Sequence, residues 1–105
     1  MNLLEETKKK LKAEGYTLNC IEWAVLQTIF CDDDISLPPF HSKKDLDEFA
    51  EKIDFDYDNG FGRQEVYGVI KLTDGSWLER CEYDGAEWFE LKRVPVFGKI
   101  PQNLE

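Results

Sequence analysis

Residues 65–93 contain the feature that most limits the fold of this chain: two Asp-Gly dipeptides that separate three β-rich runs. The runs read EVYGVIKLT, SWLERCEY and AEWFELKR. Asp-Gly between alternating segments is the strongest short-range signal for a β-hairpin, because both central residues of a type I′ turn need φ > 0. Two such turns in succession predict a three-stranded antiparallel meander that carries two of the three tryptophans.

The turns also determine which side chains of the meander share a face. If each Asp-Gly is a two-residue loop, Leu72 pairs with Trp77 and Cys81 pairs with Trp88. We expect the helices to cover the face formed by Val66, Ile70, Leu72, Trp77, Cys81, Tyr83 and Trp88. The second face would hold Tyr67, Val69, Leu78, Phe89 and Leu91. This face is unusually apolar for solvent, so the first strand, the tail or a partner should cover it, and a homodimer or larger assembly is one solution.

The same register places Glu79 opposite Glu90 and Glu82 opposite Glu87. Paired carboxylates about 5 Å apart are the catalytic groups of retaining glycosidases. A chain of 105 residues with three short strands has little room for a sugar-sized cleft, however. We therefore interpret these residues as surface charges screened by neighbouring Lys and Arg, and we expect neither enzyme activity nor a cofactor.

The first half of the chain predicts two helices and one further strand. Asn2 caps the first helix, which should run over residues 2–14. Ser42 caps the second, with Asp45 three residues on as in a capping box. The apolar stripe of the second helix comprises Leu46, Phe49, Ala50 and Ile53. Residues 18–31 fit either a strand or a helix, and their β-branched and aromatic content favours a strand.

These elements predict a single small α+β domain over residues 1–105. The order is α-β-α-β-β-β, with an antiparallel sheet and helices mainly on one face. Residues 32–39 read as a loop that ends in two prolines. Residues 94–105 contain Pro95, Gly98 and Pro101 and should form an irregular tail.

The charge of the chain is concentrated in its middle quarter. The net charge is −9, and residues 32–58 hold ten acids against three lysines, net −7. Such a field repels nucleic acid and membrane surfaces and attracts basic proteins. The candidate partner-binding residues are Asp32, Asp33, Asp34, Asp45, Asp47, Glu48, Glu51, Asp54, Asp56 and Asp58. The alternative is a solvated acidic face that only aids solubility.

Part of this acidic segment has the carboxylate spacing of a calcium loop. Asp54, Asp56, Asp58 and Glu65 occupy positions 1, 3, 5 and 12 of an EF-hand pattern, and a predicted helix precedes them. Position 6, which should be glycine, is Asn59, and a strand rather than a helix is expected to follow. A calcium- or metal-binding module is therefore an alternative function, and an acidic loop closed by Asn-Gly is the other interpretation.

Sequence features that bear on location indicate the cytoplasm. No apolar run approaches the roughly 20 residues that a membrane span requires. The N-terminus is charged from residue 5 onward and does not resemble a signal peptide. Three cysteines without a CxxC spacing are typical of reduced intracellular thiols.

Residues 57–65 (YDNGFGRQE) and 77–90 (WLERCEYDGAEWFE) resemble small uncharacterised proteins of phages and other mobile elements. The resemblance covers residues 44–95 and implies a phage or prophage context. Small acidic proteins from that context include inhibitors of host defence such as anti-CRISPR proteins, several of which occupy nucleic-acid-binding surfaces. The predicted function is a phage-encoded, non-enzymatic inhibitor in the host cytoplasm. Its acidic surface would bind a basic host protein, such as a CRISPR effector or another nucleic-acid-binding protein.

Overall fold

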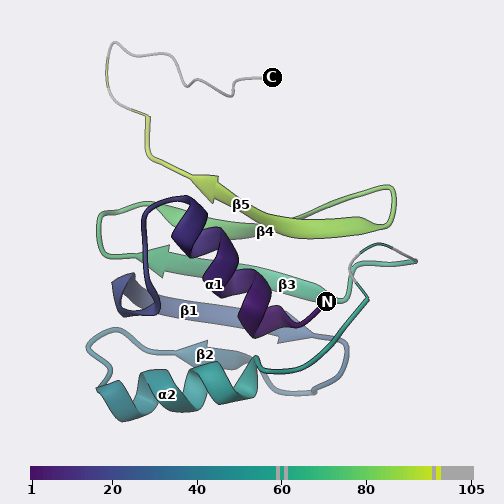
Figure 1. The fold of residues 1–105 in the computed structure, drawn as a ribbon, viewed down its shortest axis with the longest axis horizontal. Coiled ribbons are helices and arrows are strands. Elements are labelled where there is room, and N and C mark those ends of the chain that lie inside the picture. The colour runs from purple at the N-terminus through teal and green to yellow at the C-terminus, as the bar shows by residue number, and fades with distance from the viewer. Residues whose placement is uncertain (59, 61, 96, 98–105) are drawn as a thin grey trace.

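The computed structural model of the chain describes residues 1–58, 60, 62–95 and 97. It is an α+β domain in which one antiparallel sheet has the strand order β2-β1-β3-β4-β5 (Figure 1). The strands are β1 (Ile21–Thr28), β2 (Ile35–Leu37), β3 (Val66–Leu72), β4 (Trp77–Tyr83) and β5 (Ala86–Lys92). The helices are α1 (Leu3–Ala13), the 3-10 turn η1 (Leu18–Cys20) and α2 (Lys43–Lys52). The predicted fold class and the C-terminal meander are confirmed.

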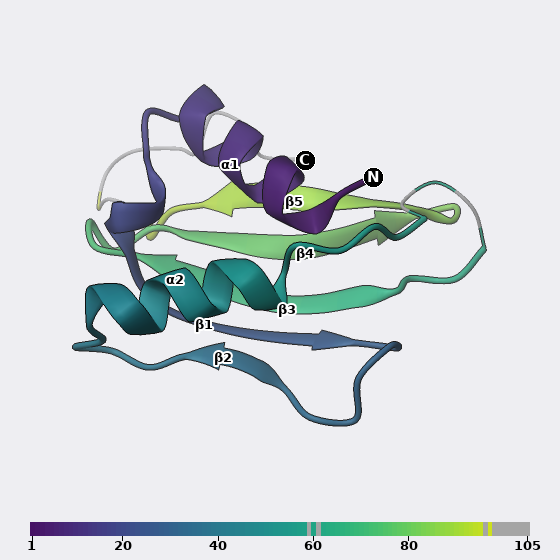
Figure 2. The same ribbon diagram turned by 60° about the horizontal axis from the view of Figure 1, so that its bottom comes forward.

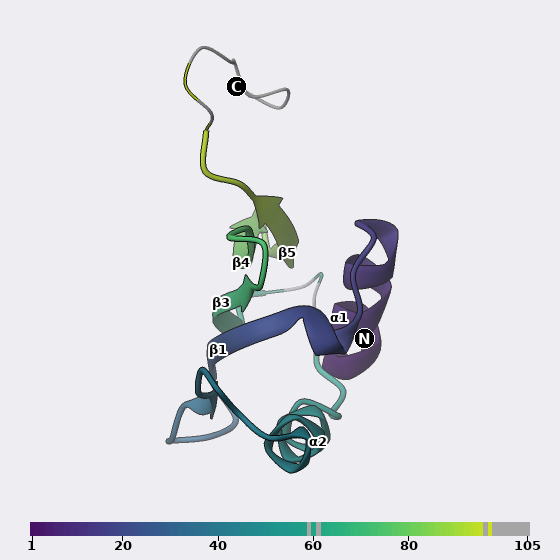
Figure 3. The ribbon, with the colours of Figure 1, turned by 90° about the vertical axis from the view of Figure 1, so that its left-hand side faces the viewer.

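Both α-helices begin at the predicted caps. The Asn2 side chain accepts a hydrogen bond from the Glu5 backbone N–H at 2.9 Å. At α2, the Ser42 hydroxyl accepts from the Asp45 N–H at 3.1 Å, and the Asp45 carboxylate accepts from the Ser42 N–H at 3.0 Å. This reciprocal pair is a capping box. The two helices lie on the same face of the sheet (Figures 2 and 3).

The region between the helices contains one strand more than predicted. Residues 21–28 form β1, as their β-branched and aromatic content indicated. The predicted loop over residues 32–39 is wrong in part, because Ile35–Leu37 pairs with β1 as the short edge strand β2. Three residues are too few to show a period, and only the buried Ile35 and Leu37 mark the strand. The element order is therefore α-β-β-α-β-β-β.

The two Asp-Gly dipeptides form different turns. Asp84 and Gly85 have φ values of 52° and 87°, which matches the predicted two-residue type I′ loop between Tyr83 and Ala86. At the first dipeptide, the Leu72 N–H donates to the Ser76 carbonyl at 2.8 Å. The loop there has three residues and ends with Gly75 at φ 95°. That arrangement is a type I turn followed by a G1 bulge.

The extra loop residue reverses the predicted faces of β4 and β5. Ile70 lies opposite Leu78, not Glu79, so every side chain of β4 and β5 changes sides relative to β3. Leu78 and Phe89 are buried under the helices. The prediction that Trp77, Cys81, Tyr83 and Trp88 face the helices is wrong, and the predicted exposed set of Tyr67, Val69, Leu78, Phe89 and Leu91 is divided between the two faces.

The core lies between the helices and the inner face of the sheet. Its fully buried members include Leu3, Leu11, Leu26, Phe49, Ile53, Ile70, Leu72 and Leu78. No helix in the described part of the chain is long and apolar enough to cross a membrane. The predicted irregular tail lies mostly outside the described residues, and residues 94 and 95 have no regular secondary structure.

Candidate functional site

All three tryptophans lie on the face of the sheet that is opposite to the two helices. Strand pairing arranges this face in rows across the sheet. The first row holds Trp23, Lys71, Trp77 and Lys92, and the second holds Val25, Val69, Glu79 and Glu90. Beyond them on the same face lie the pairs Gln27–Tyr67 and Cys81–Trp88. We call these residues the open face, because no helix of the described chain covers them (Figure 3).

Much of the open face is aromatic or aliphatic surface in contact with solvent. Trp88 is 37% exposed, Val25 40% and Tyr67 43%, while Trp23 and Trp77 are half-buried by their neighbours. A solvated face of an antiparallel sheet is usually polar. Large apolar residues gathered on one exposed face are typical of a contact surface.

Two carboxylates and two lysines, Lys71 and Lys92, interrupt this apolar surface beside the tryptophans. Glu79 and Glu90 are cross-strand partners. The Trp77 indole N–H donates to Glu79 at 3.2 Å, and the Trp88 indole N–H donates to Glu90 at 3.4 Å. Burial alone would raise the pKa of Glu90, but hydrogen bonds from Lys92, Cys81 and Trp88 outweigh it and lower that pKa. The Glu90 carboxylate is therefore ionised at neutral pH.

The inner face carries a buried ionic cluster centred on Arg80. Its guanidinium donates to Glu87 at 2.5 Å, to the Tyr57 hydroxyl at 2.8 Å and to Glu6 at 3.1 Å. The Arg80 and Glu87 side chains are 1% and 0% exposed. The guanidinium also stacks on the Phe89 ring, 4.5 Å from its centroid. Arg80 is thus held between α1, the segment after α2 and β5.

Glu87 extends this cluster to the start of β3. Its carboxylate accepts the backbone N–H groups of Glu65 at 2.6 Å and Val66 at 3.1 Å. Only the Arg80 Nε lacks a hydrogen-bond partner among the buried side-chain atoms described. The oxygen atoms of Glu6, Tyr57 and Glu87 around Arg80 thus all take part in hydrogen bonds within the fold. The sequence interpretation missed Arg80 and Glu87, because the one-residue register shift hid the fact that both point inward.

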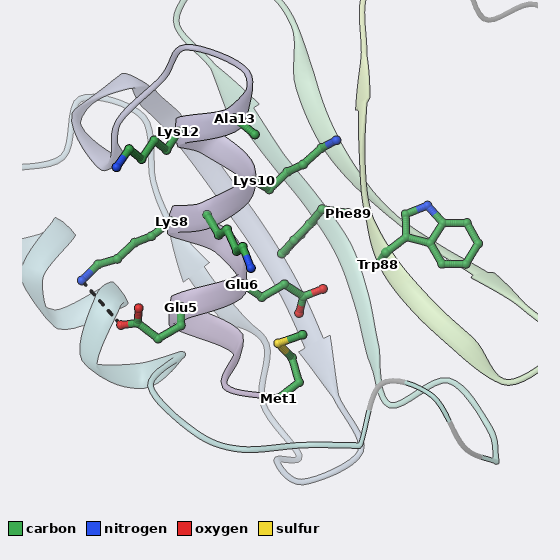
Figure 4. Close-up of a pocket in the computed structure, with 10 residues that line it drawn as sticks. Met1, Glu5, Glu6, Lys8, Lys10, Lys12, Ala13, Trp88 and Phe89 are labelled. Carbon is green, nitrogen blue, oxygen red and sulfur yellow. Dashed lines mark ion pairs between the residues drawn. The ribbon is translucent and has the colours of Figure 1, made fainter.

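A groove of about 680 Å³ separates α1 from β5 (Figure 4). Phe89 and Trp88 line its strand side, with the Trp88 ring directed away from α1, and the helix side is formed by lysines and glutamates of α1 (Figure 4). Glu5 and Lys8 form an ion pair with each other on the side toward α2, while Glu6 and Lys10 extend toward β5 (Figure 4). The described residues that line the groove include no Ser, Cys or His.

The structure places the ten predicted partner-binding acids in two areas. Four of them belong to α2: Asp45, Asp47, Glu48 and Glu51. Three lie between β1 and β2, namely Asp32, Asp33 and Asp34, and three follow α2, namely Asp54, Asp56 and Asp58. An edge-to-face contact of Phe30 and Phe55, with 5.7 Å between centroids, brings the last two groups together. All ten are exposed or half-exposed.

Several of these acids have local structural roles. Asp45 belongs to the capping box of α2, and Asp47 forms an ion pair with Lys43 at 3.3 Å. Asp54 accepts a hydrogen bond from the Asn2 amide at 2.8 Å, and Asp34 accepts one from the Gln27 amide at 2.9 Å. The acidic charge is therefore divided between two areas and partly engaged in local bonds.

The calcium-loop carboxylates do not gather around a common point. Among the described residues, no group of three or more His, Cys, Asp and Glu side chains is arranged to hold a metal ion. Asp54, Asp56, Asp58 and Glu65 are all described, and Glu65 leads into β3 rather than into a helix. The Asn2 and Asp56 backbones instead form an antiparallel bridge.

Comparisons with protein-family models, with curated proteins and with solved structures found no match for this chain. The resemblance to phage proteins therefore stays a prediction from the sequence.

Proposed function

We propose that this protein is a non-enzymatic binding protein that docks a basic protein on its open face. The observation that carries the proposal is the position of all three tryptophans on that face. Tryptophan contributes disproportionately to binding energy at protein interfaces. Burial of Trp88, Val25 and Tyr67 by a partner would remove a large apolar area from water, which is the main driving force for association.

The carboxylates of the open face favour a partner that presents arginine or lysine. Glu79 and Glu90 lie side by side, and Lys92 forms an ion pair with Glu90 at 3.4 Å. A cation of the partner bound at Glu79 would relieve the remaining repulsion between these directly opposite like charges. Trp77 and Trp88 lie beside these carboxylates and offer ring faces for cation–π contacts. A guanidinium could engage both kinds of group at once.

The acidic residues of the middle quarter have a supporting role in this proposal. A net charge of −9 speeds the encounter with a basic protein and disfavours acidic partners. A partner that uses its basic surface to bind nucleic acid would lose that surface on binding. The proposed biological effect is thus inhibition of a host nucleic-acid-binding protein, such as a defence effector, by a phage-encoded protein.

The test is an NMR titration of the isotope-labelled protein, first with an arginine-rich peptide and then, in a separate sample, with a lysine-rich peptide of the same length. We expect shift changes centred on Trp77, Glu79, Trp88 and Glu90. The double variant Trp88→Ala, Glu90→Gln should weaken binding at least tenfold, because it removes one ring and one charge from the site. Phe40→Ala is the matched control, since Phe40 is fully exposed in the loop before α2 and lies outside the open face.

A second variant separates the open face from the general acidic field. Changing Glu48 and Glu51 on α2 to lysine should slow association and reduce its dependence on salt. The peptide should still cause the same NMR shift changes at the open face of this variant. If this reversal abolishes binding and the open-face variant does not, the acidic surface is the binding site and the proposal is wrong.

A further inference from the structure

Strand β5 ends the sheet with an unpaired edge. It has seven residues, whereas β2 at the other edge has three, and no strand of the described chain pairs with its outer side. Tyr83 and Ala86 flank a two-residue loop and therefore exchange both backbone hydrogen bonds. By alternation, Trp88 and Glu90 also bond to β4, and the backbone groups of Glu87, Phe89 and Leu91 point outward. Such a row of free donors and acceptors is a template for another strand.

The two ends of this edge carry opposite charge. Glu82 and Asp84 lie at the hairpin end, while Lys92 and Arg93 lie at the other end. A second β5 strand added in parallel would bring like charges together. A second β5 strand added antiparallel would place each basic end beside the acidic turn of the other copy. The edge is therefore electrostatically complementary to itself in the antiparallel direction only.

We propose that two copies of this chain pair through β5 as antiparallel strands, with the twofold axis at Phe89. Phe89 is the middle residue of β5, so this register overlaps the whole strand. Trp88 then lies opposite Glu90 of the second copy, Ala86 opposite its Lys92, and Glu87 opposite its Leu91. No like charges are directly opposite each other, and Lys92 is diagonal to Asp84 of the second copy, within reach of a long side chain.

Among the described residues, no helix or strand lies along the outer side of β5. α1 lies over the centre of the sheet, and a groove separates it from β5 (Figures 1 and 4). A twofold axis perpendicular to the sheet keeps the helices of both copies on one side. The two open faces then lie on the other side and form one continuous surface. The pairing itself needs no external partner and does not depend on the function proposed above.

The first test is the oligomeric state of the purified full chain by sedimentation. We expect a reversible dimer that dissociates on dilution and weakens at high salt. Leu91→Pro should give a monomer, because it removes an outward N–H and leaves the bonds between β4 and β5 intact. Val94→Pro is the matched control, since Val94 is exposed and lies beyond β5, and it should remain a dimer.

A cross-linking experiment tests the register even if Leu91→Pro fails to fold. In a background with Cys20, Cys31 and Cys81 changed to Ser, the pair Trp88→Cys, Glu90→Cys should form interchain disulfides. Non-hydrogen-bonded pairs have Cα atoms about 4.5 Å apart, which suits a disulfide. The pair Ala86→Cys, Trp88→Cys has the same spacing in the chain but no opposed cysteine, and it should stay monomeric under oxidation.

Two results would overturn the proposal. One is a parent protein that sediments as a monomer up to its solubility limit. The other is a dimer that dissociates when Trp77 and Tyr67 are changed to Ala but persists in the folded Leu91→Pro variant, because that dimer would be formed by the open face.

Discussion

At the scale of single residues, Trp88 and Phe89 show how a local turn decides which side chain is buried. They are neighbours in β5 and point to opposite faces of the sheet. The two-residue loop assumed for the first Asp-Gly puts Trp88 under the helices, where its loss would cost about 3–5 kcal/mol. In the structure Phe89 is 3% exposed and packs beneath Arg80, while Trp88 is 37% exposed. The larger ring is the one available for binding.

Alanine variants of these neighbours should therefore separate stability from binding. Phe89→Ala should lower the free energy of unfolding by about 3–5 kcal/mol, because it leaves a cavity below a buried guanidinium. Trp88→Ala should cost about 1 kcal/mol or less, as substitutions at the surface usually do. Urea denaturation followed by far-UV circular dichroism gives both values. A Trp88→Ala variant destabilised as much as Phe89→Ala would mean that the open face is buried.

At the scale of elements, the two Asp-Gly turns show why one dipeptide gives two loop lengths. Asp74 accepts hydrogen bonds from the Ser76 N–H at 3.0 Å and from the Tyr16 hydroxyl at 2.5 Å. The hydrogen bonds from Ser76 and Tyr16 lower the pKa of Asp74 to about 2. Tyr16 is 58 residues away in the chain, so this contact cannot be read from the local sequence. Asp84 has no comparable contact among the described residues, and its turn follows the local rule.

Other helices and strands could be predicted where the residues that determine them are close together in the sequence. Asn2 and Ser42 cap their helices through side chains three residues or fewer from the groups they satisfy. Strand β2 has no such signal, because its assignment depends on pairing with β1. To predict the residues of the open face from the sequence, both the strand assignment of β1 and the correct register of β4 relative to β3 are required. The sequence therefore indicated an apolar contact face on the sheet and placed Tyr67 and Val69 on it correctly, but it assigned the inward-facing Leu78 and Phe89 to the same face.

The two turn glycines provide a matched pair of variants. Gly85 has φ 87° and Gly75 has φ 95°, so a β-branched residue is strained at either position, by about 1–3 kcal/mol. A Cβ atom at Gly85 would also lie 3.0 Å from the Gly62 carbonyl oxygen, whereas one at Gly75 would meet nothing within 4 Å. Gly85→Val should therefore melt lower than Gly75→Val. Equal melting temperatures would show that residue 62 is not packed on this turn.

At the scale of the whole molecule, the Arg80 cluster joins parts of the chain that are far apart in sequence. Arg80 on β4 contacts Glu6 of α1, Tyr57 of the segment after α2, and Glu87 of β5. Burial of charges costs several kcal/mol per ion, so such a cluster is weak evidence for added stability. Its bonds are directional, however, and they define how α1 and the segment after α2 sit on the sheet. We interpret the cluster as structural support for the sheet that bears the open face.

The protonation of Tyr57 should make this arrangement sensitive to alkaline pH. Burial, together with the hydrogen bond that the Tyr57 hydroxyl donates to Glu6, raises the pKa of Tyr57 well above its usual value near 10. Above pH 10 the unfolded chain has lost this proton while the folded chain retains it. The folded state then binds more protons, and the free energy of unfolding falls as pH rises.

Stability contributed by Tyr57 is therefore fully present below pH 10 and is lost progressively above it. Urea denaturation at pH 8, 9, 10 and 11 should show this loss in the parent protein. Tyr57→Phe should be less stable at pH 8, because the Arg80 and Glu6 side chains each lose a hydrogen-bond partner. Between pH 10 and 11 the variant should lose less stability than the parent, since lysine titration affects both equally. Parallel pH profiles would mean that the Tyr57 hydroxyl is solvated and that the cluster does not close around it.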